Sequence, residues 1–244
     1  MNFYNEIAHS YDKWIQNDSQ AISLTKFYRN YLKNIDAQNI VYLGIATGRI
    51  ALELTKGNSR NIIGIDNSSI MLEVCKKYFQ KNNLQNRLTL LSQNILSLNI
   101  KEKNNIYLLP FRTMLSFLSK KDKYICLKSI YSTMSKGEVF IFDIDIFNEN
   151  LAKKNNGKIF LGYENKNSGE QIYNEYHYDF KEQLVNIKVY RATLVEEKLR
   201  NISKHNYNIS WISCCDMKKI ILEIGFIVKD SIFKNEHQVW ILEK

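Results

Sequence analysis

The sequence of 244 residues is long enough for one sizeable core, either as a single large domain or as a domain that carries an insertion. Hydrophobic residues make up 45% and charged residues 24%, as in an ordinary globular protein, and no apolar run approaches the length of a membrane span. The net charge of +9 comes from scattered lysines and arginines, so we expect no nucleic-acid partner.

The amino-terminal segment indicates where the protein is located, and the cysteines indicate whether it contains a metal ion or a disulfide. Residues 1–6 contain no basic stretch followed by an apolar one, so we expect no signal peptide, a cytoplasmic location and no membrane association. The four cysteines, Cys75, Cys126, Cys214 and Cys215, do not show the spacing of metal ligands. We therefore expect reduced thiols, with neither a metal ion nor a disulfide.

The first part of the chain alternates helices with short apolar strands. A helix is predicted over residues 17–34, where Asn17, Asp18 and Ser19 offer an N-cap. Strands are predicted at residues 39–43, 61–65, 87–91, 105–109 and 138–144, with helices between them at 49–56, around 70–78 and around 124–134. This alternation predicts an α/β fold with a doubly wound, Rossmann-like sheet that is mostly parallel.

The pattern changes after residue 150. Strand-like alternation occurs at residues 158–163, 171–180, 184–195 and 198–211, with turn signals between the segments. One more helix, ended by Gly225, and two strands at 226–233 and 237–243 then resume the first pattern. We therefore expect residues 1–150 and 212–244 to form one domain. Residues 151–211 are expected to form an antiparallel β lid or substrate insertion after the fifth strand.

The loop after the first predicted strand, Gly44 to Gly48, is typical of a nucleoside-cofactor site. In such sites small residues let the backbone approach the ligand, and a carboxylate at the end of the second strand, here Asp66, accepts hydrogen bonds from ribose hydroxyls. A dinucleotide site would place a third glycine at Arg49. Small residues at Gly44, Ala46 and Gly48 instead favour a cofactor with a single nucleoside.

Six segments along the chain match motifs that occur together in one protein family. These are YNEIAHSYDKW (4–14), VYLGIATGR (41–49), GIDNSSIML (64–72), SQNILSL (92–98), LLPFRTMLSFL (108–118) and MSKGEVFIFDI (134–144). With them the sequence resembles class I S-adenosylmethionine-dependent methyltransferases, above all the small-molecule N-methyltransferases of amino sugars and related natural products. The resemblance implies a seven-stranded sheet whose last strand is antiparallel. It also implies S-adenosylmethionine as cofactor, S-adenosylhomocysteine as product, a small-molecule acceptor, and a monomer or homodimer.

The resemblance assigns roles to particular positions. The implied cofactor-binding residues are Tyr4, Tyr11, Gly44, Ala46, Thr47, Gly48, Asp66, Asn67, Met71, Asn94, Ile95 and Leu109. The candidate substrate-binding residues are Phe111, Arg112, Asp143, Asp145 and Tyr178, and the candidate catalytic residues are His177, Asp145 and Arg112. An amine must lose a proton before it attacks a sulfonium methyl group in line, and a carboxylate or histidine can take that proton. The alternative interpretations are a solvated strand residue for His177 and a surface cation for Arg112.

Three departures from the family pattern leave other functions open. Tyr42 stands where the family usually has an acid, Ala46 where it has glycine, and Asn94 where it has aspartate. One alternative is therefore a catalytically degenerate S-adenosylmethionine-binding regulatory protein. Another is an N-methyltransferase of a peptide N-terminus or an RNA base. The run from Leu108 to Phe111 lacks the polar residue and second proline that often grip a flipped base, which counts against nucleic acid.

Overall fold

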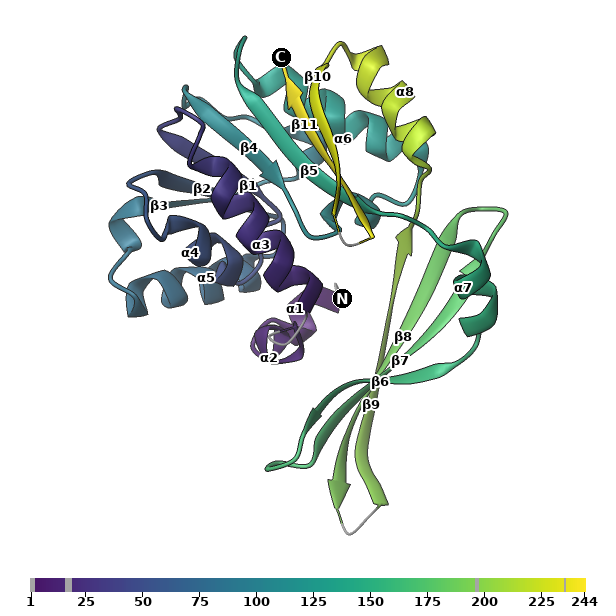
Figure 1. Cartoon of the computed structure of the whole chain (residues 1–244). Helices are drawn as coiled ribbons and strands as arrows, with labels where there is room; N and C mark the ends of the chain where they lie inside the picture. The colour runs from purple at the N-terminus through teal and green to yellow at the C-terminus, as the bar shows by residue number, and fades with distance from the viewer. Residues whose placement is uncertain (1–2, 16–18, 196–197, 235) are drawn as a thin grey trace. The chain divides into compact units, whose positions relative to one another are not determined.

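The computed structural model describes residues 3–15, 19–195, 198–234 and 236–244 of the chain. The chain divides into two compact units, which we call the first and the second unit (Figure 1). The first unit comprises Met1–Ile146 and Ser213–Lys244, and the second comprises Phe147–Ile212. None of the described helices is both long enough and apolar enough to cross a bilayer.

The first unit is built on a seven-stranded sheet. Its strands are β1 (Asn39–Leu43), β2 (Asn61–Asp66), β3 (Leu88–Ser92), β4 (Asn105–Leu109), β5 (Val139–Asp145), β10 (Ile227–Lys234) and β11 (His237–Glu243). They lie in the order β10-β11-β5-β4-β1-β2-β3, and strands β1 to β5 are parallel. Strand β11 runs antiparallel to both neighbours, β5 and β10. The predicted seven-stranded, mostly parallel sheet with an antiparallel last strand is confirmed.

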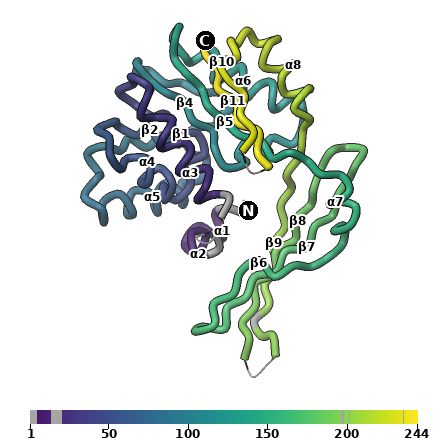
Figure 2. The backbone as a smooth tube through the Cα atoms, in the orientation of Figure 1, coloured from purple at the N-terminus to yellow at the C-terminus, as the bar shows by residue number. Residues whose placement is uncertain are grey.

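Helices connect these strands, as the tube in Figure 2 traces. They are α1 (Phe3–Ile7), α2 (Tyr11–Ile15), α3 (Ser19–Leu32), α4 (Arg49–Thr55), α5 (Ser69–Lys81), α6 (Lys120–Thr133) and α8 (Cys214–Ile224), with short 3-10 turns η1 (Gln85–Arg87), η2 (Ile95–Ser97) and η3 (Thr113–Ser116). The predicted start of the third helix at residues 17–18 lies outside the described residues. Ser68 caps α5 by accepting a hydrogen bond from the Met71 N–H. Gly225 ends α8 in the left-handed conformation, as predicted.

The core of the first unit lies around its central strands. Every residue of β1 and β4 is buried, as expected for parallel strands covered on both faces. Leu24, Tyr28 and Leu32 of α3 pack in the same cluster as side chains of β1, β2 and β4. Burial of each large apolar side chain contributes roughly 1.5–3 kcal/mol relative to exposure, so this cluster holds the sheet and the loops at its edge in place.

The second unit is a four-stranded antiparallel meander preceded by a helix. The helix is α7 (Glu149–Asn155), and the strands are β6 (Ile159–Asn165), β7 (Glu170–Asp179), β8 (Leu184–Val195) and β9 (Lys198–Ser210), paired in chain order. The predicted antiparallel sheet after the fifth strand is confirmed. The sequence pattern does not predict α7, because Ala152 is the helix's one buried residue and no apolar stripe marks it.

Candidate active site

The loop between β1 and α4 folds tightly against the second strand. The N–H group of Gly44 donates to the carbonyl of Ile65 in β2 at 2.8 Å. Three small residues of the loop have positive φ angles, 74° at Gly44, 48° at Ala46 and 76° at Gly48. A Cβ added at Gly48 would also collide with the Cys75 sulfur on α5. Glycine at position 48 is therefore required both by its backbone conformation and by the packing of α4 against α5.

Asp66 ties this loop to the end of β2. Its Oδ2 accepts a hydrogen bond from the Ala46 N–H at 2.9 Å, and its Oδ1 accepts one from the Ser68 N–H at 2.9 Å. Burial raises the pKa of Asp66, although the N–H groups of Ser68, Ala46 and Asn67 partly offset this effect. A carboxylate oxygen accepts more than one hydrogen bond, so each oxygen retains capacity for a ligand hydroxyl.

The amino-terminal segment lies on the same loop. Ile7 and Ala8 are buried against Met71 of α5, and the partly buried Tyr11 and Ala46 pack on this cluster. Met71 thereby lies in one cluster with Ala46 of the loop, and its contact with a cofactor remains a prediction. The side chain of Tyr4, another implied cofactor contact, lies outside the described residues.

Two polar contacts fasten this segment to the loop. The Asp12 carboxylate accepts a hydrogen bond from Thr47 Oγ1 at 2.7 Å and lies 3.5 Å from the Arg49 Nε. The Ser68 hydroxyl lies 2.5 Å from Asn5 Oδ1. The segment around Asp12 thus touches the loop through the side chains of Thr47 and Arg49.

The segment after β3 lies at the same edge of the sheet, because β3 is paired with β2 in parallel. Asn94 is exposed, and its Oδ1 accepts a hydrogen bond from the Leu96 N–H at 2.9 Å. Ile95 is half-buried, and the Gln93 N–H donates to the Asp66 carbonyl at 3.3 Å. Asn94 therefore caps a short 3-10 turn, and a contact of its exposed side chain with a ligand edge remains a prediction.

A strained turn follows β4, whose last residue, Leu109, is buried in the core. Phe111 and Arg112 have φ angles of 59° and 64°, a conformation that costs each of them roughly 1–3 kcal/mol. The buried carboxylate of Asp143 accepts hydrogen bonds from the N–H groups of Phe111 (2.9 Å) and Arg112 (3.2 Å) and from the Tyr28 hydroxyl (2.5 Å). These three donors hold the turn in place.

This geometry changes the interpretation of Asp143. The sequence predicts a substrate contact for it, but its side chain is 0% exposed and occupied by three donors. Because no surface of the carboxylate faces solvent, the structure gives Asp143 the role of holding the turn beneath Phe111 and Arg112.

Asp145 lies two residues further along β5 and is about one-third exposed. Its carboxylate pairs with the Arg112 Nε at 2.9 Å and lies 2.8 Å from the His237 Nδ1. Burial raises the pKa of Asp145, but the His237 contact and the Arg112 charge outweigh burial, so the pKa lies below its usual value. Asp145 is therefore an ionised carboxylate shared between two basic groups.

His237 is missing from the sequence-based candidates. It is 1% exposed and opens β11, where the strand register sets it opposite Asp145. Because β11 is antiparallel to β5, its first residue lies at the carboxyl end of β5, where doubly wound sheets bind ligands. In the sequence, one can see only that a histidine opens the last predicted strand. The pairing of β11 with β5 is needed to show that this histidine lies opposite Asp145.

His177 and Tyr178 belong to the second unit. The His177 Nε2 lies 2.5 Å from Glu175 Oε1 and 2.7 Å from Lys188 Nζ. Hydrogen bonds from Tyr190 first, and then from His177 and Lys188, lower the pKa of Glu175 to about 2. The Tyr178 ring stacks on Phe180 at 6.0 Å. A catalytic role for His177 and a substrate contact for Tyr178 remain predictions.

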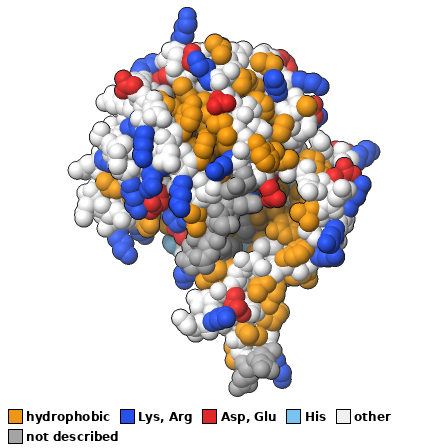
Figure 3. All heavy atoms as spheres, viewed as in Figure 1, with side chains coloured by type: hydrophobic (Ala, Val, Ile, Leu, Met, Phe, Trp, Pro, Cys, Tyr) orange, Lys and Arg blue, Asp and Glu red, His pale blue; other side chains and the backbone are white. Residues whose placement is uncertain are grey.

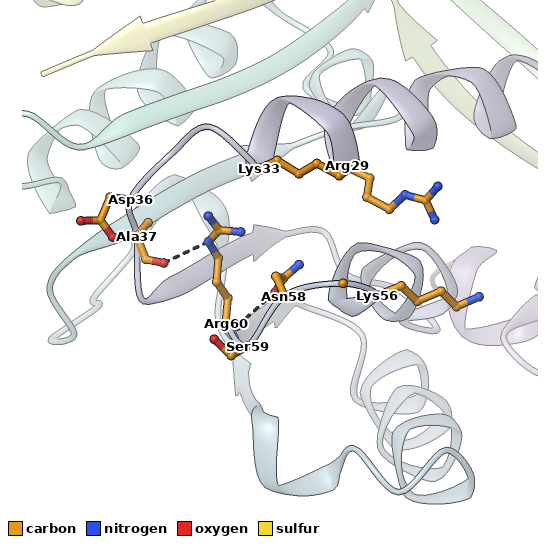
Figure 4. A pocket seen from close by; sticks show the side chains of 9 residues that line it. Arg29, Lys33, Asp36, Ala37, Lys56, Asn58, Ser59 and Arg60 are labelled. Atoms are coloured by element: carbon orange, nitrogen blue, oxygen red, sulfur yellow. Dashed lines mark hydrogen bonds between the residues drawn. The ribbon is translucent and has the colours of Figure 1, made fainter.

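A basic cavity of about 310 Å³ lies elsewhere, just before β1 and β2 in the chain (Figure 4). It is lined by Arg29, Lys33, Asp36, Ala37, Lys56, Gly57, Asn58, Ser59 and Arg60. The Arg60 guanidinium donates to the carbonyls of Ala37 (3.0 Å), Leu32 (2.8 Å) and Ile35, so it ties the end of α3 to β2. Because its lining residues come just before β1 and β2, this cavity lies at the amino ends of these strands, whereas the loop from Gly44 to Gly48 lies at the carboxyl end of β1.

Charged side chains are dispersed over the face of the molecule that Figure 3 draws. Figure 3 shows Lys and Arg side chains scattered among neutral and apolar ones. The described residues include no group of three or more His, Cys, Asp or Glu that could hold a metal ion.

Comparisons with known proteins match part of the chain to a protein family. Residues 40–137 match the family described as a methyltransferase domain. The carboxy-S-adenosyl-L-methionine synthase of Vibrio parahaemolyticus serotype O3:K6 (strain RIMD 2210633) is 31% identical over 122 residues, which are 46% of this chain and 49% of the relative. The chain therefore spans about half the length of the curated relatives it matches.

Two solved structures match nearly the whole chain. An S-adenosylmethionine-dependent methyltransferase from Clostridium acetobutylicum ATCC 824 is 20% identical, covers 99% of each chain and gives a TM-score of 0.77. An amino pentose methyltransferase from Micromonospora echinaspora, involved in calicheamicin biosynthesis and solved with S-adenosylmethionine bound, is 10% identical. It covers 100% of this chain and 98% of its own, with a TM-score of 0.72. At these identities the likeness concerns the fold.

Residues 40–137 thus match a methyltransferase-domain family, and the whole chain shares its fold with S-adenosylmethionine-dependent methyltransferases. These comparisons agree with the resemblance found in the sequence, through the family match over residues 40–137 and through the fold over the whole chain. The amino pentose methyltransferase was solved with S-adenosylmethionine, which is also the cofactor that the sequence predicts for this chain.

Proposed function

We propose that the protein transfers a methyl group from S-adenosylmethionine to a small molecule that carries an amine. The observation that carries this proposal is the contact between the loop from Gly44 to Gly48, which we call the cofactor loop, and the turn that follows β4. A Cβ added at Gly44, in the cofactor loop, would lie 2.9 Å from Thr113 Cγ2, in the turn after β4. The cofactor loop and the strained turn at Phe111 and Arg112 therefore touch at one edge of the sheet, as methyl transfer between two ligands requires.

The residues of this edge divide the work of binding and reaction. The loop from Gly44 to Gly48 would hold the methionine side of the cofactor, and Asp66 would accept from its ribose hydroxyls. Because a carboxylate with a lowered pKa is ionised at neutral pH, Asp145 would hold and orient an ammonium acceptor by its charge, and the proton of the ammonium group would pass to solvent before the amine attacks. Arg112, bound to Asp145, would set the distance between acceptor and carboxylate.

The proposed acceptor class rests on two supports. One is the ionised, partly exposed Asp145 next to the turn. The other is the likeness of fold, over the whole chain, to an amino pentose methyltransferase. The second unit would cover the acceptor as a substrate lid, and the protein would act in the cytoplasm as a monomer or homodimer in the biosynthesis of a natural product.

The curated relatives favour a second candidate function. They are carboxy-S-adenosyl-L-methionine synthases, and two of them are 31% and 29% identical to this chain over 122 residues. A protein of that kind would convert S-adenosylmethionine itself, whereas an N-methyltransferase would leave S-adenosylhomocysteine and a heavier amine.

Calorimetry with S-adenosylmethionine and S-adenosylhomocysteine tests the shared part of both functions. We expect both ligands to bind, and a chain that binds neither at millimolar concentration would refute the proposal. Mass spectrometry after incubation with a panel of amino sugars and other amines then separates the functions. A mass increase of one methyl group on an amine, with release of S-adenosylhomocysteine, supports N-methylation. A parallel incubation adds a carboxyl donor, either bicarbonate or an acid that releases carbon dioxide, and a carboxylated cofactor with no methylated amine would support the second candidate.

A further inference from the structure

Two nitrogen atoms of the Arg49 guanidinium are buried beside the loop from Gly44 to Gly48 without a hydrogen-bond acceptor among the described residues. Arg49 follows Gly48 directly, and its side chain is 20% exposed. Its Nε and Nη2 atoms are inaccessible to solvent, and the described residues supply neither with a hydrogen-bond acceptor. A guanidinium is always charged and presents its donors as a planar fork, so buried donors without acceptors are costly. Such a fork matches a carboxylate, which can accept two parallel hydrogen bonds.

The surroundings of Arg49 contain one recorded ion-pair partner among the described residues. Asp12 Oδ1 lies 3.5 Å from the Arg49 Nε and at the same time accepts from Thr47 Oγ1 at 2.7 Å. The Asp66 carboxylate binds the backbone N–H groups of Ala46 and Ser68 rather than the Arg49 guanidinium. Within the described part of the chain, the charge of Arg49 is therefore met by one long ion-pair contact, to Asp12 of the amino-terminal segment.

Tyr42 does not supply an anion here. Its side chain is 4% exposed, and burial raises the pKa of its hydroxyl well above the usual value, despite the opposing effect of the Arg49 charge. At neutral pH the phenol is therefore uncharged. Since Tyr42 lies on β1, two residues before Gly44, the loop is flanked by a neutral group on the strand side and by Arg49 on the helix side.

One cation and one anion thus lie 3.5 Å apart next to the loop. An α-amino acid carries its ammonium and its carboxylate on the same carbon, so it presents two opposite charges at a similar spacing. S-adenosylmethionine and S-adenosylhomocysteine both end in such a group. A ligand carboxylate would supply the acceptors that the Arg49 fork lacks, and the Asp12 carboxylate, one-third exposed, would accept from the ammonium.

We propose that Arg49 and Asp12 form the recognition pair for the amino-acid end of the cofactor, with Arg49 binding the carboxylate and Asp12 the ammonium. This inference rests on the proposed function, because it assumes a cofactor of the adenosylmethionine type. It assigns to two charged side chains the recognition that an acid at position 42 would otherwise provide.

The test compares three adenosyl ligands by calorimetry on the full chain. S-adenosylhomocysteine carries both charges, its decarboxylated analogue keeps only the amine, and 5′-methylthioadenosine carries neither. We expect the wild-type chain to bind S-adenosylhomocysteine at least about tenfold more tightly than the decarboxylated analogue. In Arg49→Gln that preference should fall below about threefold, while affinity for the decarboxylated analogue stays unchanged.

Further variants separate recognition from folding. Arg49→Lys keeps the charge but loses the fork, so it should retain an intermediate preference. Asp12→Asn should weaken both amine-bearing ligands and leave 5′-methylthioadenosine unaffected. Lys76→Gln, an exposed cation on α5, serves as the matched control and should bind like the wild type. Circular dichroism and thermal unfolding establish that each variant is folded.

Two results would overturn the inference while the proposed function stands. One is a folded Arg49→Gln variant that keeps the full preference for the carboxylate. The other is an equal loss of affinity for all three ligands, which would show that Arg49 only holds the amino-terminal segment in place. A wild-type chain that binds none of the three ligands would instead refute the proposed function itself, and the inference with it.

Discussion

The hydroxyl of Tyr28 lies 2.5 Å from a carboxylate oxygen of Asp143, and both side chains are fully buried. Burial and the nearby Asp143 charge raise the pKa of Tyr28 well above its usual value, so its hydroxyl remains a hydrogen-bond donor. The same carboxylate holds the N–H groups of Phe111 and Arg112. One residue of α3 thereby helps to fix a strained turn about 80 residues further along the chain.

Removing the Tyr28 hydroxyl should destabilise the first unit. We expect Tyr28→Phe to lower the free energy of unfolding by about 1–3 kcal/mol, because it takes a donor from a buried carboxylate and keeps the ring. Urea unfolding at pH 7 measures this. Tyr31→Phe, on the same helix with a ring stacked on Phe27, is the matched control and should change stability by less than about 0.5 kcal/mol. An equal effect of the two variants would contradict the prediction.

The contacts of Asp145 should make stability depend on pH. Burial raises its pKa, but the His237 contact and the Arg112 charge bring it below the usual value. Such a carboxylate stabilises the fold above its unfolded pKa, near 3.9, and this contribution is lost as the pH falls through the lower folded pKa. Asp145→Asn should therefore unfold at a lower temperature than wild type at pH 7, and the two should converge below about pH 4.

Thermal unfolding at pH 7, 5 and 3 measures this convergence. Asp36→Asn, which alters an exposed carboxylate before β1, is the control and should follow the wild type at each pH. A gap between Asp145→Asn and wild type that is as large at pH 3 as at pH 7 would refute a role for the ionised carboxylate.

A comparison of Gly48 and Gly57 distinguishes the cost of backbone strain from the cost of a steric clash when alanine replaces glycine. Both have left-handed backbone, with φ of 76° and 80°, but a Cβ at Gly57 meets nothing within 4 Å while one at Gly48 collides with Cys75. We expect Gly57→Ala to cost about 1 kcal/mol and Gly48→Ala to cost a further 1–3 kcal/mol or so. Urea unfolding compares them, and adding Cys75→Ala to Gly48→Ala should recover part of the loss. Equal costs would show that the α4–α5 packing tolerates a side chain.

Asp66 should control affinity for the adenosyl ligand. Asp66→Asn replaces an acceptor-only carboxylate by an amide, so one hydrogen bond to a ribose hydroxyl is lost. We expect the affinity for S-adenosylhomocysteine, measured by calorimetry, to fall by about 10–100-fold. Asp36→Asn again serves as control. Unchanged binding by a folded Asp66→Asn variant would remove Asp66 from the cofactor site.

Local patterns in the sequence were sufficient for most of the fold. The five apolar stretches alternate with helical stripes because buried parallel strands must be apolar on both faces, and this requirement is visible residue by residue. The same holds for the loop at Gly44, Ala46 and Gly48, since positive φ angles select small residues. Helix α7 was not predicted because Ala152 is its single buried residue, so its sequence shows no apolar residues at helical spacing.

The sequence by itself therefore determined the α/β fold, the meander after β5, the glycine loop and the carboxylate Asp66 at the end of β2. Only the tertiary structure decided that Asp143 holds a turn, that His237 stands opposite Asp145, and that Arg49 meets Asp12. The physical reason is distance along the chain. Backbone conformation and burial leave local patterns, whereas contacts between residues tens of positions apart depend on strand register and packing, which no local pattern records.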